Sequence, residues 1–365
     1  MAKKNKLTVI DLFAGCGGLS EGFVKAGFKS ISAVEIDSHI AKTLKKNHPH
    51  TKVFSENICN VDSKKLLDGY EDIDIIVGGP PCQGFSMAGK RIRNSGIFLD
   101  DPRNQLFREF YRIVSDVKPK IFLMENVPGI LNIHNGEIRE IILDLYRKLG
   151  YETSYDVLLA SEYGVPQMRR RAFFIGNRLG IDPTLLFPSK THGDNLKNVV
   201  TIEDAIFDLP FIQNNQGEFR SDYDKKPFTN YQKLLRGNST SLFNHVASNH
   251  DENILDLMKM IPEGHGMKDL PEKYRTKSIH SGAYGRMTRS KPAYTITTRF
   301  DSPPVGRVTH PVVNRTITAR EAARLQSFSD HFIFYGSKSS IGIQIGNAVP
   351  PLLAQAIAQK IKNYL

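Results

Sequence analysis

The sequence predicts an α/β fold, in which a mostly parallel sheet is covered by helices on both faces and is followed by a second, smaller and less regular domain. From residue 7 to about 177, short apolar runs alternate with segments of helical periodicity. The apolar runs are rich in branched side chains, as in strands buried on both faces. After about residue 188 the periodicity weakens, and Asn, Ser, Gly, Pro and His accumulate over a stretch too long for a loop.

The elements of the first domain can be assigned in order. Strands are expected at residues 7–12, 30–35, 52–54, 74–77 and 120–124, and helices at 38–46, 105–115 and 137–149. The last of these helices is expected to stop at Gly150. Residues 153–159 and 171–176 are separated by Gly164 and Pro166, which predicts a hairpin at the sheet edge. A closing apolar helix over 351–365 is expected to return to this domain.

Composition limits the kinds of partner and cofactor. The 365 residues carry a net charge of +11, which favours an anionic partner, most simply nucleic acid. The three cysteines, Cys16, Cys59 and Cys82, contain no C-x-x-C pair and form no even framework. Neither a disulfide scaffold nor a zinc site is therefore expected, no metal is predicted, and a reducing cytoplasm fits best. No apolar run is long enough to cross a bilayer.

A glycine-rich segment, residues 11–18, follows the first strand and opens the first helix. Glycines in such a turn let backbone amides approach a ligand closely. Glu35 ends the second strand, where a carboxylate accepts hydrogen bonds from a ribose diol. The spacing departs from the full G-x-G-x-x-G pattern, so a dinucleotide and S-adenosylmethionine both remain open.

Reactive side chains are expected at the same edge of the sheet. Two prolines stop the fourth strand and place Cys82 on a rigid corner, where open α/β sheets bind ligands. Glu125 ends the fifth strand, and Gln167, Arg169 and Arg171 are spaced by two along an extended segment, so that they face one way. A lone cysteine is usually a buried apolar residue, but a thiol, a carboxylate and guanidinium groups together indicate an active site.

Seven blocks, in order, make the chain resemble the DNA (cytosine-5) methyltransferases of bacterial restriction-modification type. The blocks are residues 11–18, 35, 80–83, 125–127, 167–171, 320–326 and 346–351. The resemblance implies a Rossmann-like sheet of the S-adenosylmethionine-dependent methyltransferases in residues 1–187, completed by residues 340–365. It also implies a target-recognition domain at 188–310 and a hinge region at 311–339.

The resemblance assigns a mechanism to the reactive residues. Cys82 would add to carbon-6 of a cytosine that is flipped out of the duplex. Glu125 would hydrogen-bond or protonate ring nitrogen-3 and hold the exocyclic amine. Arg169 and Arg171, with Gln167 beside them, would stabilise ring oxygen-2.

S-adenosylmethionine, with S-adenosylhomocysteine as product, is the cofactor that the resemblance implies. Phe13 would stack on the adenine, and Asn57 stands where the family usually has an aspartate. The complete set of expected cofactor contacts is Asp11, Phe13, Ala14, Gly15, Gly17, Leu19, Glu35, Ile36, Asn57, Ile58, Pro80, Asn347 and Val349.

Duplex DNA is the expected partner. Residues 86–103 form a basic segment that we expect to close over the flipped base, and Lys and Arg outnumber acids again from 268 to 299. Expected DNA contacts are Gln83, Ser86, Lys90, Arg91 and Arg93 near the cysteine, and Arg286, Arg289, Lys291 and Arg299 in the second domain.

Three other functions remain to be distinguished: a tRNA cytosine methyltransferase, a catalytically silent DNA-binding regulator and a nicotinamide oxidoreductase. The family's RNA-modifying members typically carry a Cys-Phe-Thr signature, which neither Cys16 nor Cys59 begins. The expected setting is the prokaryotic cytoplasm at the nucleoid. A monomer is expected, and two settings stay open: a restriction-modification system with a cognate endonuclease that acts on the same site, or a solitary methyltransferase.

Overall fold

The computed structural model describes residues 6–81, 104–275 and 282–365, and the chain forms two compact units. The first unit comprises Met1–Leu159, Arg170–Lys190 and Pro351–Leu365, and the second comprises Ala160–Arg169 and Thr191–Pro350. The chain therefore passes between units near residues 190 and 350, where the sequence suggested 187 and 340. The connection between the last two strands of the sheet belongs to the second unit.

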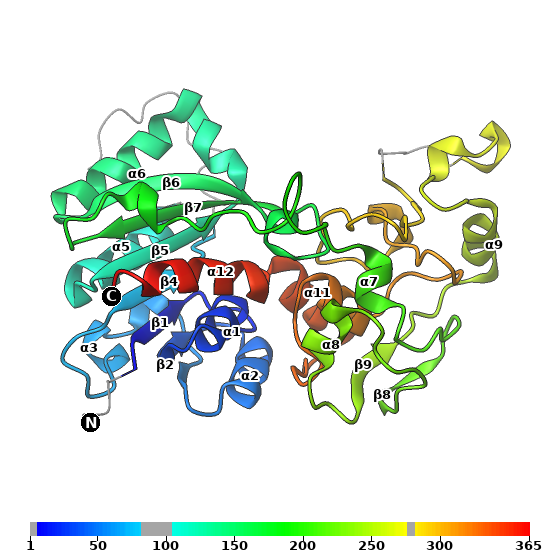
Figure 1. The fold of residues 1–365 in the computed structure, drawn as a ribbon, viewed down its shortest axis with the longest axis horizontal. Helices are drawn as coiled ribbons and strands as arrows, with labels where there is room; N and C mark the ends of the chain where they lie inside the picture. Colours follow the sequence, from blue (N-terminus) through cyan, green and yellow to red (C-terminus); the bar gives the residue numbers. More distant parts are fainter. Residues whose placement is uncertain (1–5, 82–103, 276–281) are drawn as a thin grey trace. The chain divides into compact units, whose positions relative to one another are not determined.

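The first unit is built on a seven-stranded sheet with the order β3-β2-β1-β4-β5-β7-β6 (Figure 1). The strands are β1 (Thr8–Leu12), β2 (Lys29–Val34), β3 (Lys52–Phe54), β4 (Ile75–Gly78), β5 (Ile121–Asn126), β6 (Glu152–Leu159) and β7 (Arg170–Asn177). Strands β1 to β5 pair in parallel, whereas β7 is antiparallel to both β5 and β6. The predicted α/β sheet is confirmed, and it is a mixed sheet whose antiparallel pair lies at one edge.

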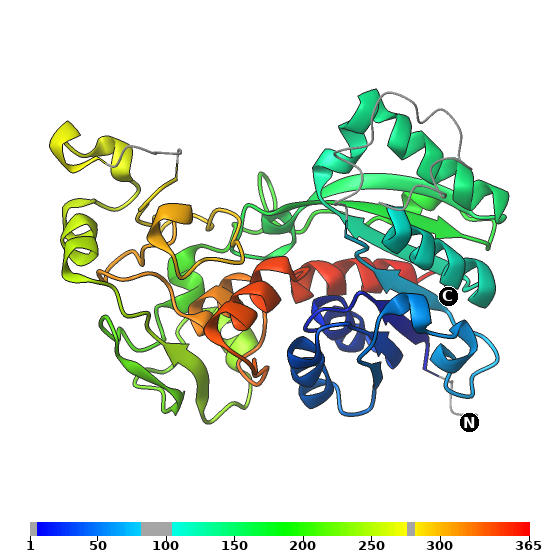
Figure 2. The ribbon, with the colours of Figure 1, turned by 180° about the vertical axis from the view of Figure 1, so that it is seen from behind.

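Helices cover both faces of this sheet (Figures 1 and 2). They are α1 (Gly18–Lys25), α2 (Ser38–Asn47), α3 (Ser63–Leu66), α5 (Gln105–Val117), α6 (Glu137–Lys148) and α12 (Pro351–Lys362). Helix α12 packs against α1, where Lys362 Nζ donates to the carbonyl of Ala26 at 2.8 Å. Both ends of the chain thus contribute to the first unit.

Local sequence explains where these helices begin and end. The Asp37 carboxylate accepts from the backbone N–H groups of His39 and Ile40, which caps α2. Helix α6 ends just before Gly150, whose φ of 83° is the left-handed conformation that favours glycine.

A dense aromatic core lies between the sheet and α5 and α6. Phe110 and Phe122 are fully buried, and the rings of Phe122 and Tyr146 lie with centroids 4.0 Å apart. Burying each such side chain contributes about 1.5–3 kcal/mol. This packing fixes β4 and β5, whose carboxyl ends carry the residues expected to be reactive.

The second unit contains a two-stranded antiparallel sheet and several short helices. These elements are β8 (Gly217–Ser221), β9 (Leu242–Val246), α7 (Ile202–Ile206), α8 (Asn230–Arg236), α9 (Glu252–Met260), α10 (Ala319–Leu325) and α11 (Lys338–Asn347). Short 3-10 segments of the two units are η1 (Ile58–Asn60), η4 (Pro128–Gly136), η5 (Ala160–Tyr163), η6 (Pro183–Leu186), η7 (Met267–Asp269), η8 (Glu272–Tyr274) and η9 (Pro303–Val305). Helix α10 is buried along almost its whole length and begins with a capping box between Thr318 and Glu321.

One helical stretch, Lys338–Lys362, is long and apolar enough to cross a membrane when judged by length and composition alone. It consists of α11 and α12, and 61% of its most apolar window is buried inside the protein, as in a core helix. No second stretch among the described residues meets this criterion.

Candidate active site

The turn after β1 adopts a left-handed backbone and is tied to β2. Phe13, Gly15 and Gly17 have φ values of 57°, 56° and 99°. The Ala14 N–H donates to the carbonyl of Val34 at 2.9 Å, and the Gly15 N–H donates to Glu35 Oε2 at 2.9 Å. The turn therefore has a fixed shape, although left-handed φ costs Phe13 roughly 1–2 kcal/mol.

The two glycines of this turn have different surroundings. A Cβ atom on Gly15 would meet no atom within 4 Å, so this backbone borders open space. A Cβ atom on Gly17 would lie 2.6 Å from Leu44 Cδ1, so Gly17 is required for packing against α2. Ile36, which follows Glu35, is 65% exposed and gives the second strand's end an apolar surface. Of the two glycines, Gly15 is the one with room for a ligand.

Glu35 is held by the backbone on both sides of this space. Its Oε1 accepts from the Asp37 N–H at 2.8 Å, and its Oε2 accepts from Gly15. Partial burial raises the pKa of Glu35, and the backbone N–H groups of Asp37 and Gly15 oppose that rise. Each carboxylate oxygen keeps a second lone pair with which it can accept a further hydrogen bond.

Asp11 lies beneath the turn and is completely buried. Its Oδ2 accepts from the Ser20 N–H at 3.1 Å and from Ser20 Oγ at 2.6 Å, while Oδ1 has no hydrogen-bond partner among the described residues. Burial raises the pKa of Asp11 to about 7, against the opposing effect of the Ser20 hydrogen bonds. Asp11 thus joins β1 to α1 through Ser20, a partner that the sequence pattern does not indicate.

The other residues expected at the cofactor are divided between the two units. In the first unit Ala14, Leu19, Ile58 and Pro80 are buried, and Asn57 Oδ1 accepts from the Cys59 N–H at 3.1 Å, where it caps η1. One lone pair of the Asn57 oxygen is therefore already in use. Asn347, which is exposed, and Val349, which is buried, belong to the second unit.

The ends of β4 and β5 bring Gly79 close to Glu125, and Pro80 close to Asn126. The strands are parallel with Gly78 opposite Met124, and a Cβ atom on Gly79 would lie 2.8 Å from Glu125 Oε2. Asn126 Nδ2 donates to the carbonyl of Pro80 at 3.1 Å. A side chain on Gly79 would displace the glutamate, and Asn126 fixes the chain two residues before Cys82. The sequence pattern alone indicates no role for Gly79 or Asn126.

Cys82 itself lies outside the described residues, as do the expected DNA contacts Gln83, Ser86, Lys90, Arg91 and Arg93.

Glu125 forms an ion pair with Arg171 on the neighbouring strand β7. Arg171 Nε lies 2.7 Å from Glu125 Oε1, and the two side chains are only 15% and 13% exposed. Arg171 Nη1 donates to the carbonyl of Arg170 at 2.8 Å. Two nitrogen atoms of the guanidinium group therefore bind protein acceptors, and the pair holds the Glu125 carboxylate in one orientation.

Gln167 and Arg169 lie in the second unit, where both are fully buried. Gln167 Nε2 donates to the Leu325 carbonyl at 3.1 Å, and its Oε1 accepts from the Ile296 N–H at 2.9 Å. Arg169 donates through Nη1 to the Ile296 carbonyl at 3.3 Å and through Nη2 to the Gly346 carbonyl at 2.9 Å. These contacts join segments that are distant in sequence, so both side chains position the backbone of the second unit.

The expected DNA-reading role of Arg286 does not fit the structure. Arg286 is 5% exposed, and its guanidinium group donates to four backbone carbonyls and to the side chain of Asn314. It is a structural residue, because its donors are already used inside the unit. Arg289 pairs with Glu263 at 2.9 Å, and Arg299 lies 3.6 Å from Asp301. Lys291 is exposed.

Metal binding is not indicated by the described part of the chain, where no group of three or more His, Cys, Asp or Glu residues could hold an ion.

A protein-family model described as C-5 cytosine-specific DNA methylase matches residues 7–363 of the chain. The Type II methyltransferase M.DdeI of Desulfomicrobium norvegicum is 39% identical over 382 residues, which cover 98% of this chain and 89% of that protein. The Type II methyltransferase M1.HphI of Haemophilus parahaemolyticus is also 39% identical, over 97% of this chain and 86% of its own length.

Solved structures show the same similarity. A DNA modification methyltransferase encoded within an E. coli prophage superposes with a TM-score of 0.78 at 30% identity, over 98% of this chain and 99% of that one. The Dnmt2 methyltransferase of S. pombe superposes with a TM-score of 0.64 over 98% of this chain and 99% of that one, but at 16% identity this likeness concerns the fold alone.

Proposed function

Because the chain belongs to the family of C-5 cytosine-specific DNA methylases, we propose that this DNA cytosine-5-methyltransferase uses S-adenosylmethionine to methylate a flipped-out cytosine through covalent addition of Cys82. The observation that carries the proposal is the Glu125–Arg171 ion pair beside Gly79, three residues before Cys82. The pair fixes a carboxylate beside the segment that leads to Cys82, and this supports an active site at that sheet edge.

The turn after β1 fits a cofactor that contains a nucleoside. Gly15 borders open space, Ile36 offers an apolar surface, and Glu35 is held where it can accept hydrogen bonds from a ribose diol. Phe13, Gly15, Glu35 and Ile36 would hold the cofactor. When bound, S-adenosylmethionine supplies a methyl group on a positively charged sulfur, which is a strong electrophile.

Cys82 would supply the nucleophilic step. Carbon-5 of cytosine is a poor nucleophile, so the thiolate first forms a bond to carbon-6 and pushes the ring electrons onto carbon-5, giving an enamine. After carbon-5 has been methylated, loss of its proton to a base restores the double bond and breaks the bond between sulfur and carbon-6. The thiolate is then regenerated, so the addition and elimination steps balance.

Glu125 would act on ring nitrogen-3 and the exocyclic amine, so that negative charge does not build up on the ring. Arg171 supports this role, because its bond to Oε1 leaves Oε2 as the carboxylate oxygen on the Gly79 side. Arg171 is thus a positioning residue for Glu125, and its positive charge would also favour the thiolate of Cys82. Gln167 and Arg169 would position the segment that leads into β7.

Base flipping is part of the proposal, because a thiol cannot reach carbon-6 inside a duplex. Residues 83–93, with Lys90, Arg91 and Arg93, would contact the phosphates around the flipped base. Arg289, Lys291 and Arg299 remain candidates for DNA contact from the second unit, which we propose as the target-recognition domain.

The names of the relatives suggest a biological setting. M.DdeI and M1.HphI are Type II methyltransferases, so we propose a restriction-modification system in which an endonuclease cuts the same sequence when it lacks the methyl group. A monomer suffices for this chemistry, because the proposed groups all come from one chain.

Bisulfite sequencing of DNA from a host that expresses the chain tests the reaction and reveals the sequence context. We expect protected cytosines at one recurring sequence, and none with Cys82→Ala. The matched control is Cys59→Ala, because Cys59 is also a free thiol and alanine keeps its backbone hydrogen bond to Asn57. This control should retain full methylation.

Covalent capture tests the mechanism separately. A duplex whose target cytosine carries fluorine at carbon-5 cannot complete the elimination, so the wild-type protein should form a complex that survives denaturing electrophoresis. Full activity in Cys82→Ala would disprove the covalent route. Transfer of labelled methyl to tRNA but not to duplex DNA would show that the substrate is RNA.

A further inference from the structure

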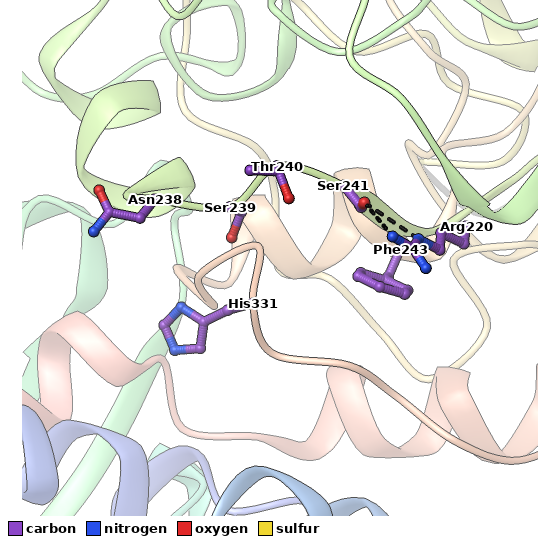
Figure 3. Close-up of a pocket in the computed structure, with 7 residues that line it drawn as sticks. All are labelled: Arg220, Asn238, Ser239, Thr240, Ser241, Phe243 and His331. Carbon is purple, nitrogen blue, oxygen red and sulfur yellow. Dashed lines mark hydrogen bonds between the residues drawn. The ribbon is translucent and has the colours of Figure 1, made fainter.

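The second unit contains an open pocket of about 450 Å³, and none of its lining residues has a role in the proposed reaction (Figure 3). Its walls come from β8, from β9 and the segment between α8 and β9, and from the loop after α10. Arg220 contributes from β8 and His331 from the loop, and both are exposed. The pocket is therefore reachable by a large partner.

The lining is rich in hydrogen-bond donors and contains no acid. Between α8 and β9, the consecutive residues Asn238, Ser239, Thr240 and Ser241 supply an amide group and three hydroxyl groups. All four line the pocket together with the Arg220 guanidinium and the His331 imidazole (Figure 3). A pocket of donors with one fixed positive charge suits an anion with several oxygen atoms, and a phosphate group is the common example.

The Arg220 side chain is already oriented. Its Nε and Nη2 donate to Ser241 Oγ at 3.2 and 3.1 Å, as Figure 3 shows. Its guanidinium also lies 5.8 Å from the ring centroid of Phe243, the residue directly opposite in the β8–β9 register. A guanidinium held in this way loses little rotamer freedom when it binds an anion.

The acids nearest to Arg220 in sequence weaken the site only partly, and Asp330, next to His331, is buried and paired with Arg324. Glu218 and Asp222 flank Arg220 at a distance of two residues, but neither lines the pocket. Both are exposed, so water and salt screen their charges.

We propose that this pocket binds a phosphate group of the duplex DNA backbone. This inference rests on the proposed function, since it places one phosphate contact of the DNA substrate in the second unit. The open shape and the hydroxyl donors favour a phosphate of a long polymer over an enclosed small ligand. The site fixes the position of the DNA without reading its sequence, because phosphates carry no sequence information.

Binding of a mixed-sequence DNA duplex, measured by fluorescence anisotropy over a range of salt concentrations, tests the pocket. With Arg220→Gln, we expect about tenfold weaker binding and a slope of log affinity against log salt reduced by about 0.9. Arg220→Lys should restore the slope, because it keeps the charge. Ser239→Asp should also weaken binding, because it adds an acid among the donors.

Lys65→Gln is the matched control, since Lys65 is an exposed cation on α3 and its loss changes the net charge equally. It should leave the salt slope unchanged. Circular dichroism spectra that match the wild type, together with unchanged S-adenosylmethionine binding, would establish that each variant is folded.

The outcomes separate this inference from the proposed function. Wild-type DNA binding and methylation with an unchanged salt slope in Arg220→Gln would overturn the pocket assignment alone. An Arg220-dependent response to inorganic pyrophosphate without any effect on DNA would also overturn it, in favour of a small-anion site. Arg220-dependent binding of tRNA by a protein that neither binds nor methylates duplex DNA would overturn both proposals.

Discussion

Asp11 is a buried acid whose charge state depends on the structure around it. It lies at the turn after β1, with one oxygen bound twice by Ser20 and the other without a partner among the described residues. Its pKa is about 7 in the folded chain, compared with about 3.8 for an exposed aspartate, and burial is the main cause. Between these two values the folded state holds a proton that the unfolded state has released.

Replacing Asp11 should therefore change how stability depends on pH. A raised carboxyl pKa in the folded state means that wild-type stability falls as pH rises from about 4 to about 7 and is then level. The full effect is on the order of 4 kcal/mol. Asp11→Asn should remove this decline, so its stability relative to wild type should be higher at pH 8 than at pH 5, as measured by urea unfolding.

Asp62→Asn is the control for that experiment, because Asp62 is an exposed carboxylate that caps α3. Its difference from wild type should be small and the same at both pH values. If Asp11→Asn and wild type kept parallel pH profiles, Asp11 would have an ordinary pKa in the folded protein.

At the residue scale, the sequence predicts the residue types of the site better than their contacts. The positions of Glu35 and Glu125 follow from the strand pattern, and the structure shows both at strand ends with defined hydrogen-bond or ion-pair partners. The burial of Arg286 could not be predicted, because its acceptors are carbonyl groups contributed by residues 258–313. Every residue has a backbone carbonyl group, so the pattern of side chains does not indicate which carbonyl groups will accept hydrogen bonds from an arginine.

Helix α10 illustrates how an element in the second unit is held by buried charges. Arg315 makes two bonds of 2.8 Å to Glu321, whose Oε2 also accepts from the Thr318 N–H at 2.7 Å. Arg324 pairs in the same way with Asp208 and Asp330. Burial, the largest influence on Glu321, raises its pKa, but the Arg315 charge and hydrogen bonds bring the pKa below its usual value.

Removing the charge of Glu321 should cost far more than removing an exposed partner. Glu321→Gln leaves the fully buried Arg315 without its anionic partner, which we expect to cost about 3–5 kcal/mol in urea unfolding. The control is Asp256→Asn on α9, because Asp256 and Lys259 are 2.9 Å apart but more than half exposed, and this should cost below about 1 kcal/mol. Equal losses in the two variants would mean that the α10 network is not specially stabilising.

The stability of Glu321→Gln at acidic pH gives a second test of this network. Because the pKa of Glu321 is lowered in the folded state, its stabilisation is present above about pH 4.5 and is lost as pH falls below that value. Glu321→Gln should therefore lose less stability than wild type on acidification.

At the scale of the whole molecule, the sequence predicts the sheet because its strands are short, apolar and separated by helices. The sequence predicted that β6 and β7 form a hairpin at the sheet edge. It did not predict that β7 lies between β5 and β6, because that order depends on tertiary packing. The division of the chain was harder to predict, because residues 160–169 belong to the second unit although both flanking strands belong to the first. Such assignments depend on long-range packing, which local periodicity does not encode.

Gly22 lies where α1, near the start of the chain, packs against α12, near its end. Replacing it tests whether this close packing stabilises the protein. A Cβ atom on Gly22 would touch Ala354 and would lie 2.6 Å from the Pro351 carbonyl oxygen and 2.7 Å from the Gln355 nitrogen, all in α12. Gly22→Ala should lower the free energy of unfolding, measured in urea, by about 1–3 kcal/mol, although alanine favours helix by up to about 1 kcal/mol. Gly129→Ala is the control, since a Cβ atom there would meet nothing within 4 Å, and it should be neutral or slightly stabilising. A Gly22→Ala protein as stable as Gly129→Ala would show that α12 does not need this close approach to α1.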